Sequence, residues 1–445
     1  MLRGFESHTL RHKIEGIRVS YSSKNPYREP LARHTRLRRP SIVGRFFKGL
    51  AFVLSAVLVA GIGVGAYAYQ EYFGTLKDNS VVLSGQDVDP PSAEVLPNSD
   101  LNILVTGVDK CEEDSNEKFG DRCPPELIEA QKNSYEGQLN DVNMIIHISP
   151  EPRHVTVISL PRDLMTSRPE CYDDLRDATV PASTLAQFNT AYSSGGLDCI
   201  ARSASELTGL RIDHAALMTW DGVIEITNAI GGVEVCLEDP IPYDWHTDFE
   251  LSEGPHTLVG YQALQFLRVR YTLQSGSDLD RIGNQQLYMG SLVRKLTSED
   301  TFGDVGKLLR LAKAVTGNAT VSSGLADPMA LVSIASALRG IPVSDYTFIQ
   351  FPAADDPNNR YRIIPVMDTW NLIAEALEKN QVIELGDEDP ADEPTEEPTA
   401  SPTPGVSETP SVDEPDDERV KIPGYLRGSN ASNNAGNCGT PEGLF

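Results

Sequence analysis

Residues 140–163 read NDVNMIIHISPEPRHVTVISLPRD, and two short apolar runs in this stretch predict how the chain folds. The runs NMIIHI and VTVISL are typical of buried strands, and the run NILVTG at 102–107 marks the start of a folded domain. Helix and strand patterns then alternate, in the order IARSASELTGL (a helix ended by Gly209), HAALMTW (strand), GVIEITNAIGG (helix) and VEVCL (strand). This alternation predicts an α/β domain in which a central mixed β-sheet is flanked by helices on both faces.

The pattern becomes mainly helical after residue 285. Helices are expected in QQLYMGSLVRKL, in DVGKLLRLAKAV and in DPMALVSIASALRG, where Asp327 and Pro328 suit the N-cap and the first helical position. Two strands, YTFIQF and RIIPV, and a helix opened by Asp368 complete the domain, which we place at 99–383.

Charge is unevenly distributed along the chain. The formal net charge is −26, yet residues 1–48 carry twelve Lys or Arg against three Glu, so the remainder is strongly acidic. Because non-specific nucleic-acid binding needs cations facing phosphates, we expect no nucleic-acid partner. Residues 384–418 hold fourteen Asp or Glu and no Lys or Arg, with repeated EP and TP steps. This composition predicts that 384–445 form an acidic, Pro-rich, disordered tail.

Residues 49–69, GLAFVLSAVLVAGIGVGAYAY, contain no charged side chain. As a helix they would span roughly 31 Å, which matches the hydrocarbon thickness of a bilayer, so we predict a transmembrane helix that is not cleaved. Basic residues precede this helix, which by the positive-inside rule predicts that 1–48 are cytoplasmic and that the chain beyond a spacer at 70–98 lies outside the cell. The basic segment either contacts anionic lipid or serves only as an orientation signal.

Six cysteines all follow the membrane segment, as expected for an external, oxidising location. They form no CxxC pair, and the histidines form no HExxH or paired zinc pattern, so disulfides are favoured over zinc. Six cysteines allow fifteen pairings. Cys111 with Cys123 and Cys171 with Cys199 would close local loops, which leaves Cys236 with Cys438 as the remaining pair.

Charged residues stand at the ends of the predicted strands, where open α/β sheets bind ligands. Asp109 follows NILVTG, Asp141 precedes NMIIHI, and Arg162 with Asp163 follows VTVISL. The chain contains no nucleophile elbow, Walker loop or Rossmann fingerprint, so the common hydrolase and nucleotide-binding functions lack support.

A second cluster of charge lies in ALQFLRVRYTLQSGSDLDRIGNQQ. If FLRVRY is extended, Arg268 and Arg270 point to one face, and on a helix that starts near Asp278, Arg281 and Gln285 share a face. Guanidinium groups suit phosphate oxygens, so this spacing indicates either a phosphate site or simple pairing with surface carboxylates.

The ordered set GVDK, NDVN, SLPRD, FNTAYSSGG, TWDGVIEITNAIGGVEV, GYQALQFLRVR and SDLDRIGNQQ resembles the LytR-CpsA-Psr family of envelope phosphotransferases over about 100–300. The resemblance implies transfer of a glycopolymer from a polyprenyl-pyrophosphate carrier to cell-wall peptidoglycan, which forms a phosphodiester. The cysteine-bearing pattern resembles actinobacterial members, which implies arabinogalactan or a related polymer.

The resemblance also implies a role for individual residues. It implies that Mg²⁺ is bound by Asp109 and Asp141. It implies a catalytic pyrophosphate clamp of Arg162, Arg268, Arg270 and Arg281. It implies that substrate binding is assisted by Lys110, Asp278 and Gln285. Asp163 is expected to be structural rather than a base, and the lipid is expected to need an apolar tunnel.

The chain departs from the family pattern at three places. Gln187 and Asn284 stand where the family often has cations, and Lys110 is expected to compensate in part. The two metal aspartates are 32 residues apart, separated by an inserted stretch that carries Cys111 and Cys123. Two other functions remain open, namely a non-catalytic receptor for lipid-linked glycans and a regulator of transcription of the kind that the family's older name suggests.

Overall fold

The computed structural model describes residues 80–84, 99–113, 115–273, 278–298, 305–327, 330, 333–334, 337–338, 341–385, 420–422, 428–430 and 438. Within this part of the chain, no helix is both long enough and apolar enough to cross a membrane. The predicted membrane helix at 49–69 lies outside the described residues, as do the basic segment and nearly all of the predicted spacer.

The described residues contain a seven-stranded sheet with the order β13-β8-β1-β2-β3-β14-β19. Strand β1 pairs antiparallel with β2 and parallel with β8, and β3 pairs antiparallel with β2 and parallel with β14. The predicted mixed sheet is therefore confirmed. Its strands are β1 (Leu101–Val108), β2 (Asn140–Ile148), β3 (Val155–Ser159), β8 (His214–Met218), β13 (Ala319–Val321), β14 (Tyr346–Gln350) and β19 (Gly428–Asn430).

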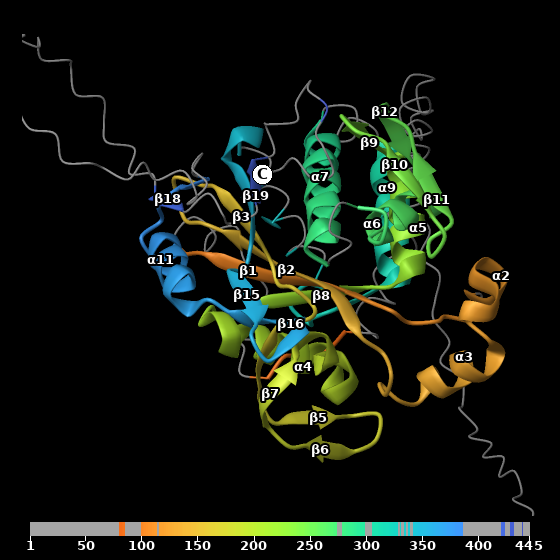
Figure 1. Cartoon of the computed structure of the whole chain (residues 1–445), viewed down its shortest axis with the longest axis horizontal. Helices are drawn as coiled ribbons and strands as arrows, with labels where there is room; N and C mark the ends of the chain where they lie inside the picture. Colours follow the sequence, from red (N-terminus) through yellow and green to blue (C-terminus); the bar gives the residue numbers. More distant parts are fainter. Residues whose placement is uncertain are drawn as a thin grey trace, which may run out of the picture. The chain divides into compact units, whose positions relative to one another are not determined.

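Alternate side chains of the central strands bury against helices on opposite faces, as period two requires. Leu104 and Ile145 join a core with α4 (Ala191–Thr208) and α11 (Met367–Glu378). Their neighbours Ile103 and Met144 join a second core with α7 (Asp278–Thr297). Figure 1 shows α4 and α7 on opposite sides of β1 and β2, so the prediction of helices on both faces is confirmed.

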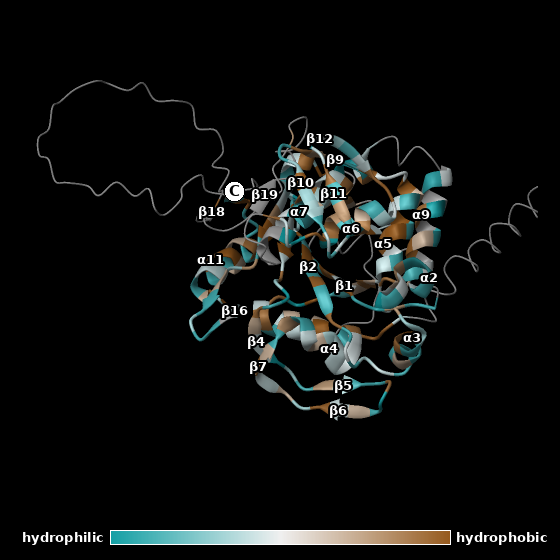
Figure 2. Cartoon of the chain, turned by 45° about the vertical axis from the view of Figure 1, so that its right-hand side comes forward, coloured by the Kyte–Doolittle hydropathy of each residue, from teal (hydrophilic) through white to brown (hydrophobic). Residues whose placement is uncertain are grey.

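A third core packs around α5 and α6, beside the sheet. In Figure 2 the ribbon of α5 is largely brown, whereas α2 is largely teal, in keeping with the apolar α5 sequence WDGVIEITNAI. The helices are α2 (Ser115–Phe119), α3 (Pro125–Lys132), α5 (Trp220–Ile230), α6 (Tyr261–Arg268) and α9 (Val305–Asn318), with a 3-10 turn η1 (Gly120–Arg122). The small strands are β4 (Met165–Arg168), β5 (Cys171–Asp173), β6 (Ala178–Val180), β7 (Ser183–Gln187), β9 (Val233–Leu237), β10 (Ile241–Asp244), β11 (Phe249–Leu251), β12 (Gly254–Leu258), β15 (Ala353–Asp356), β16 (Asn359–Pro365), β17 (Ile383–Leu385) and β18 (Val420–Ile422).

Two sequence-based expectations were wrong. The segment FLRVRY is not a strand, because α6 continues through Arg268 and the apolar Ala263, Leu264 and Phe266 bury on that helix. The strand predicted in HAALMTW ends at Met218, and α5 begins at Trp220 with Thr219 as its N-cap. The helix predicted in IARSASELTGL is confirmed within α4, because the backbone of Gly195 and Gly196 is not helical and the helix that Gly209 ends, with φ 75°, begins beyond that kink, close to Ile200. The predicted 327–340 helix lies largely outside the described residues.

All three expected cysteine pairs are disulfides: Cys111–Cys123, Cys171–Cys199 and Cys236–Cys438. The third connects the third core to a segment that was predicted to be tail. Strand β18 of that segment pairs with β17, and β19 pairs with β14 of the main sheet. The folded unit therefore does not end at residue 383.

His147 on β2 gives the fold a dependence on pH. The ring is 2% exposed, and its Nδ1 lies 2.8 Å from Asn102 Oδ1. Burial lowers the pKa of His147 to about 4, so the unfolded chain binds a proton first as pH falls below the usual His value. Between about pH 6.5 and 4 this group should remove about 3 kcal/mol from the free energy of unfolding.

We therefore expect a His147→Gln variant to lose less unfolding free energy than the parent between pH 7 and pH 4. Urea unfolding at several pH values measures the difference. Equal losses in the two proteins would contradict the assignment.

Candidate functional site

The paired ends of β1 and β2 bring the two predicted metal carboxylates together. In the β1–β2 register Val108 lies opposite Asn140, and the Asp109 backbone N–H donates to the Leu139 carbonyl at 3.1 Å. The inserted stretch therefore leaves the sheet after Asp109 and returns just before Asp141. The 32-residue separation in sequence does not separate the carboxylates in space, as the sequence analysis allowed.

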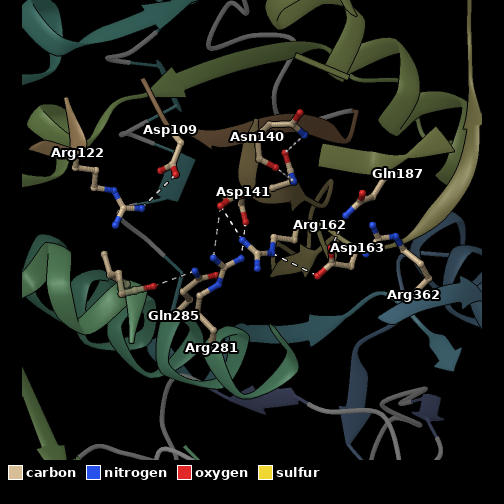
Figure 3. A network of polar contacts seen from close by, with 12 residues as sticks. Asp109, Arg122, Asn140, Asp141, Arg162, Asp163, Gln187, Arg281, Gln285 and Arg362 are labelled. Atoms are coloured by element: carbon tan, nitrogen blue, oxygen red, sulfur yellow. Dashed lines mark hydrogen bonds and ion pairs between the residues drawn. The ribbon is translucent and has the colours of Figure 1, made fainter. Parts of the chain in front are cut away.

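Two arginines converge on Asp141 from different elements. Arg162, just beyond β3, donates through Nη1 to Asp141 Oδ2 at 2.8 Å. Arg281 on α7 donates through Nη2 to the Asp141 carbonyl at 2.8 Å, and its Nη1 lies 4.0 Å from Oδ2. Figure 3 shows both guanidinium groups directed toward Asp141. The carboxylate thus orients two cations at the same end of the sheet.

Arg268 and Arg270 reach the site from the end of α6 rather than from a strand. Arg268 lies over the Trp220 ring, 4.4 Å from its centroid, and Trp220 begins α5 at the end of β8. Backbone N–H groups of Arg270 and Tyr271 donate to the buried Asp244 carboxylate, each at 3.3 Å. These contacts fix the turn that follows α6, so both arginines face the strand ends.

One cavity of about 410 Å³ contains these groups. Its polar lining includes Asp109, Arg122, Asp141, Arg162, Arg268, Arg270, Arg281 and Gln285. Its apolar lining includes Val105, Met144, Val223, Ile226, Leu264, Leu267, Met289 and Leu292. The cavity is therefore a charged site continuous with an apolar chamber, in keeping with the apolar tunnel that was expected for the lipid.

Helix α7 shows the change from polar to apolar along one face. Arg281, Gln285, Met289 and Leu292 all line the cavity, and spacings of three or four residues place them on successive turns. Over these residues the helix rises about 17 Å. The prediction that Arg281 and Gln285 share a helix face is confirmed.

The predicted substrate-binding residues are not all at the cavity. Gln285 lines it and donates to the Leu267 carbonyl at 3.3 Å. Lys110 is not among the described residues that line it. Asp278 is the first residue of α7, but its side chain lies outside the described part of the structure.

Asp163 supports the site from outside the cavity. Its carboxylate accepts a hydrogen bond from Gln187 and forms ion pairs with Arg162 at 3.5 Å and Arg362 at 3.7 Å. Figure 3 shows Asp163 among these side chains, on the far side of Arg162 from Asp141. Gln187, which stands where a cation was expected, therefore bonds Asp163, and these contacts agree with the structural role predicted for Asp163.

The electrostatics of the site favour ligands of both signs. Burial, and then repulsion from Asp141, raises the pKa of Asp109, although 35% of its side chain is exposed. Burial, and then repulsion from Arg122, lowers the pKa of Arg268. A cation beside the aspartates and an anion between the arginines would relieve these two costs.

The residues present fit a magnesium ion that is shared with a phosphate ligand. Asp141 Oδ1 is buried and has no hydrogen-bond partner among the described residues. No cluster of three or more His, Cys, Asp or Glu that could hold a metal occurs in the described part of the chain. Two carboxylates completed by phosphate oxygens and water form a donor set typical of Mg²⁺.

Two residues that line the cavity, Arg122 and Trp220, were not predicted from the sequence to belong to the site. Arg122 ends η1 in the inserted stretch, and its Nη2 lies 3.7 Å from Asp109 Oδ2. Trp220 was assigned to the end of a strand. The place of Arg122 next to Cys123 in a disulfide-closed loop does not by itself indicate a ligand-binding role.

Comparison with known proteins gives a consistent result. Residues 69–380 match the model of the LytR_cpsA_psr family. The chain is 27% identical to the cell wall biosynthesis protein LcpA of Corynebacterium glutamicum, over 69% of this chain and 60% of LcpA. It is 27% identical to the polyisoprenyl-teichoic acid–peptidoglycan teichoic acid transferase TagU of Bacillus cereus, over 61% of this chain and 80% of TagU.

A solved structure of the LytR-Csp2A-Psr enzyme from Actinomyces oris aligns with a TM-score of 0.46 and 20% identity, over 66% of this chain and 94% of that chain. The match to LcpA, by contrast, spans less than two thirds of the length of LcpA.

The contacts of Asp163 predict a structural cost when its carboxylate is removed. Asp163→Ala leaves Gln187, Arg162 and Arg362 without this partner, so we expect the free energy of unfolding to fall by about 1–2 kcal/mol. Asp163→Asn keeps an acceptor oxygen and should lose less. Urea unfolding at neutral pH measures both, and an alanine variant as stable as the parent would contradict the structural role.

Proposed function

Because the chain belongs to the LytR_cpsA_psr family, we propose that it transfers a glycopolymer from a polyprenyl-pyrophosphate carrier to cell-wall peptidoglycan. One observation carries the proposal. Four predicted arginines and two predicted aspartates, from β2, from α7 and from the ends of β1, β3 and α6, line one cavity that continues between apolar side chains.

The cavity suits an amphiphilic diphosphate. Its arginine-lined part would hold the pyrophosphate, since guanidinium forks bond phosphate oxygens in pairs and stay charged at physiological pH. Its apolar part, lined by residues such as Leu267 and Leu292, would take the first isoprene units of the lipid. The glycan would then extend from the polar opening toward the acceptor.

In the proposed reaction, a peptidoglycan hydroxyl oxygen attacks the phosphorus atom that carries the glycan. The new P–O bond forms as the bond to the bridging oxygen breaks, polyprenyl phosphate leaves with the electron pair of that bond, and the hydroxyl proton passes to solvent water. Loose phosphoryl transition states are helped mainly by positioning and by neutralisation of charge. Arg162 and Arg281, held by Asp141, would supply both.

Asp109 and Asp141 would hold the Mg²⁺ ion. The ion, when bound, would neutralise charge on the phosphate oxygens. Asp141 can serve the ion and the arginines together, because Arg162 and Arg281 contact its Oδ2 and its backbone carbonyl while Oδ1 has no partner among the described residues.

The proposal includes the predicted membrane topology. A single helix at 49–69 would anchor the chain with its N-terminus in the cytoplasm and the cavity outside, where lipid-linked donor and peptidoglycan meet. The expected donor glycan is arabinogalactan or a related polymer.

Removing a carboxylate or a guanidinium group from the cavity should greatly slow glycopolymer transfer. With a pyrophosphate-linked lipid glycan, Mg²⁺ and peptidoglycan, we expect Asp109→Ala and Arg268→Ala each to lower the transfer rate by a factor of about 10² or more. The measurement is the amount of phosphodiester-linked glycan on isolated peptidoglycan.

Arg211→Ala serves as the control, because Arg211 pairs with Asp213 at 2.6 Å and is not a lining residue. Unchanged transfer by folded Asp109→Ala and Arg268→Ala would reject the assigned roles. Binding of the donor by the parent without any turnover would indicate a receptor instead.

The metal assignment predicts a dependence that can be measured without turnover. In the presence of inorganic pyrophosphate, Mg²⁺ binding by titration calorimetry should be seen for the parent and lost in Asp109→Asn, because a neutral amide is a weak ligand for a hard cation. Equal Mg²⁺ affinity in the two proteins would remove Asp109 from the metal site.

A further inference from the structure

The inserted stretch between Asp109 and Asp141 is a docked element. Its disulfide Cys111–Cys123 packs in a small core with Trp220, Ile224 and Leu264. Phe119 meets the Trp220 ring edge-on, with 5.0 Å between the centroids. The first part of the insertion therefore packs against the start of α5 and against α6, two of the helices that border the cavity.

Asp221 fixes the same insertion by polar contacts. Its side chain is 3% exposed, and it accepts from Lys118 Nζ at 2.6 Å and from Ser115 Oγ at 3.1 Å. Both donors belong to α2, and Asp221 lies on the first turn of α5. Breaking these contacts would leave the buried Asp221 carboxylate unpaired, which is costly, so α2 is held against α5.

This docking places Arg122 inside the cavity lining. Its guanidinium lies over the Trp220 ring, 4.8 Å from the centroid, and Arg268 lies 4.4 Å from the same ring. Figure 3 shows Arg122 directed toward Asp109. The 3.7 Å between Arg122 Nη2 and Asp109 Oδ2 is longer than a hydrogen bond. With 47% of its side chain exposed, Arg122 keeps its donors within reach of a ligand.

Positively charged side chains outnumber negatively charged ones around Arg122. Arg122 and Arg268 share one aromatic ring and repel each other, and Asp109 is the carboxylate beside them. Five arginines and two aspartates line the cavity as a whole. Two guanidinium groups held this close to one another are best satisfied by an anion that both can bond.

We propose that Arg122 is a fifth phosphate-binding cation of this site, which bonds an oxygen of the diphosphate beside Arg268, and that the Cys111–Cys123 loop holds it in place. The inference rests on the proposed function, because the ligand is the same lipid diphosphate. Arg122 supplies, from the insertion, the extra cation that was expected from Lys110.

The test measures binding of inorganic pyrophosphate with Mg²⁺ to the full-length chain by titration calorimetry at low salt. Arg122→Gln should weaken pyrophosphate binding about tenfold, and Arg122→Lys, which keeps the charge but loses the fork, should lie between it and the parent. Arg176→Gln is the matched control. It lies between the cysteines of another disulfide, pairs with Asp173 and is 39% exposed, but it does not line the cavity.

The role of the loop is tested by the double variant Cys111→Ser/Cys123→Ser. It should weaken pyrophosphate binding by a similar factor, and adding Arg122→Gln to it should cause little further loss, because both changes remove the same contact. Additive losses would show that the loop does not act through Arg122. Thermal unfolding of each variant identifies any change that comes from loss of the fold.

The outcomes separate this inference from the proposed function. Weak pyrophosphate binding by Arg268→Ala together with parental affinity in Arg122→Gln would overturn the role of Arg122 and leave the proposed function standing. Parental affinity in both variants would overturn both. A lower unfolding temperature in Arg122→Gln without a change in affinity would show that Arg122 is structural.

Discussion

The antiparallel pairing of β1 with β2 is the constraint on which the site depends. Its register sets Val108 against Asn140, so the chain leaves and re-enters the sheet at one point. Two carboxylates then stand at that point whatever the length of the segment between them. An insertion is tolerated there because closing a longer loop between fixed ends costs little additional entropy.

Ion pairs between arginines and aspartates hold the side chains of the site in position. Asp141 is backed by Arg162 and Arg281, and Arg162 in turn is backed by Asp163. Such a chain of ion pairs fixes each side chain through the next, which is how a site can be organised before its ligand arrives. The arginines nearest α5, Arg122 and Arg268, differ, since both also lie over one aromatic ring, that of Trp220.

Much of the sheet and part of the site could be predicted from the sequence because the signals were local. Apolar runs fixed β1, β2 and β3, and Asp109 and Asp141 were recognised at the ends of those runs, although their meeting depends on the antiparallel pairing of β1 with β2. The i, i+4 spacing of Arg281 and Gln285 needed only a helix. Arg268 was placed in a strand because FLRVRY alternates like one, whereas packing of Phe266 in the third core selects a helix. Arg122 could not be predicted, since its position depends on Asp221, which is 103 residues from Lys118.

The acidic stretch between β17 and β18 is connected at both ends to paired strands. Ile383 pairs with Val420, and Leu385 pairs with Ile422, so the segment 386–419 begins and ends at neighbouring points on the protein. At roughly 3.5 Å per residue, a segment tethered at both ends extends no farther than about 60 Å from its attachment, half the distance open to a free end. The acidic stretch is therefore joined to the folded unit at both of its ends, by β17 and by β18, rather than at one end alone.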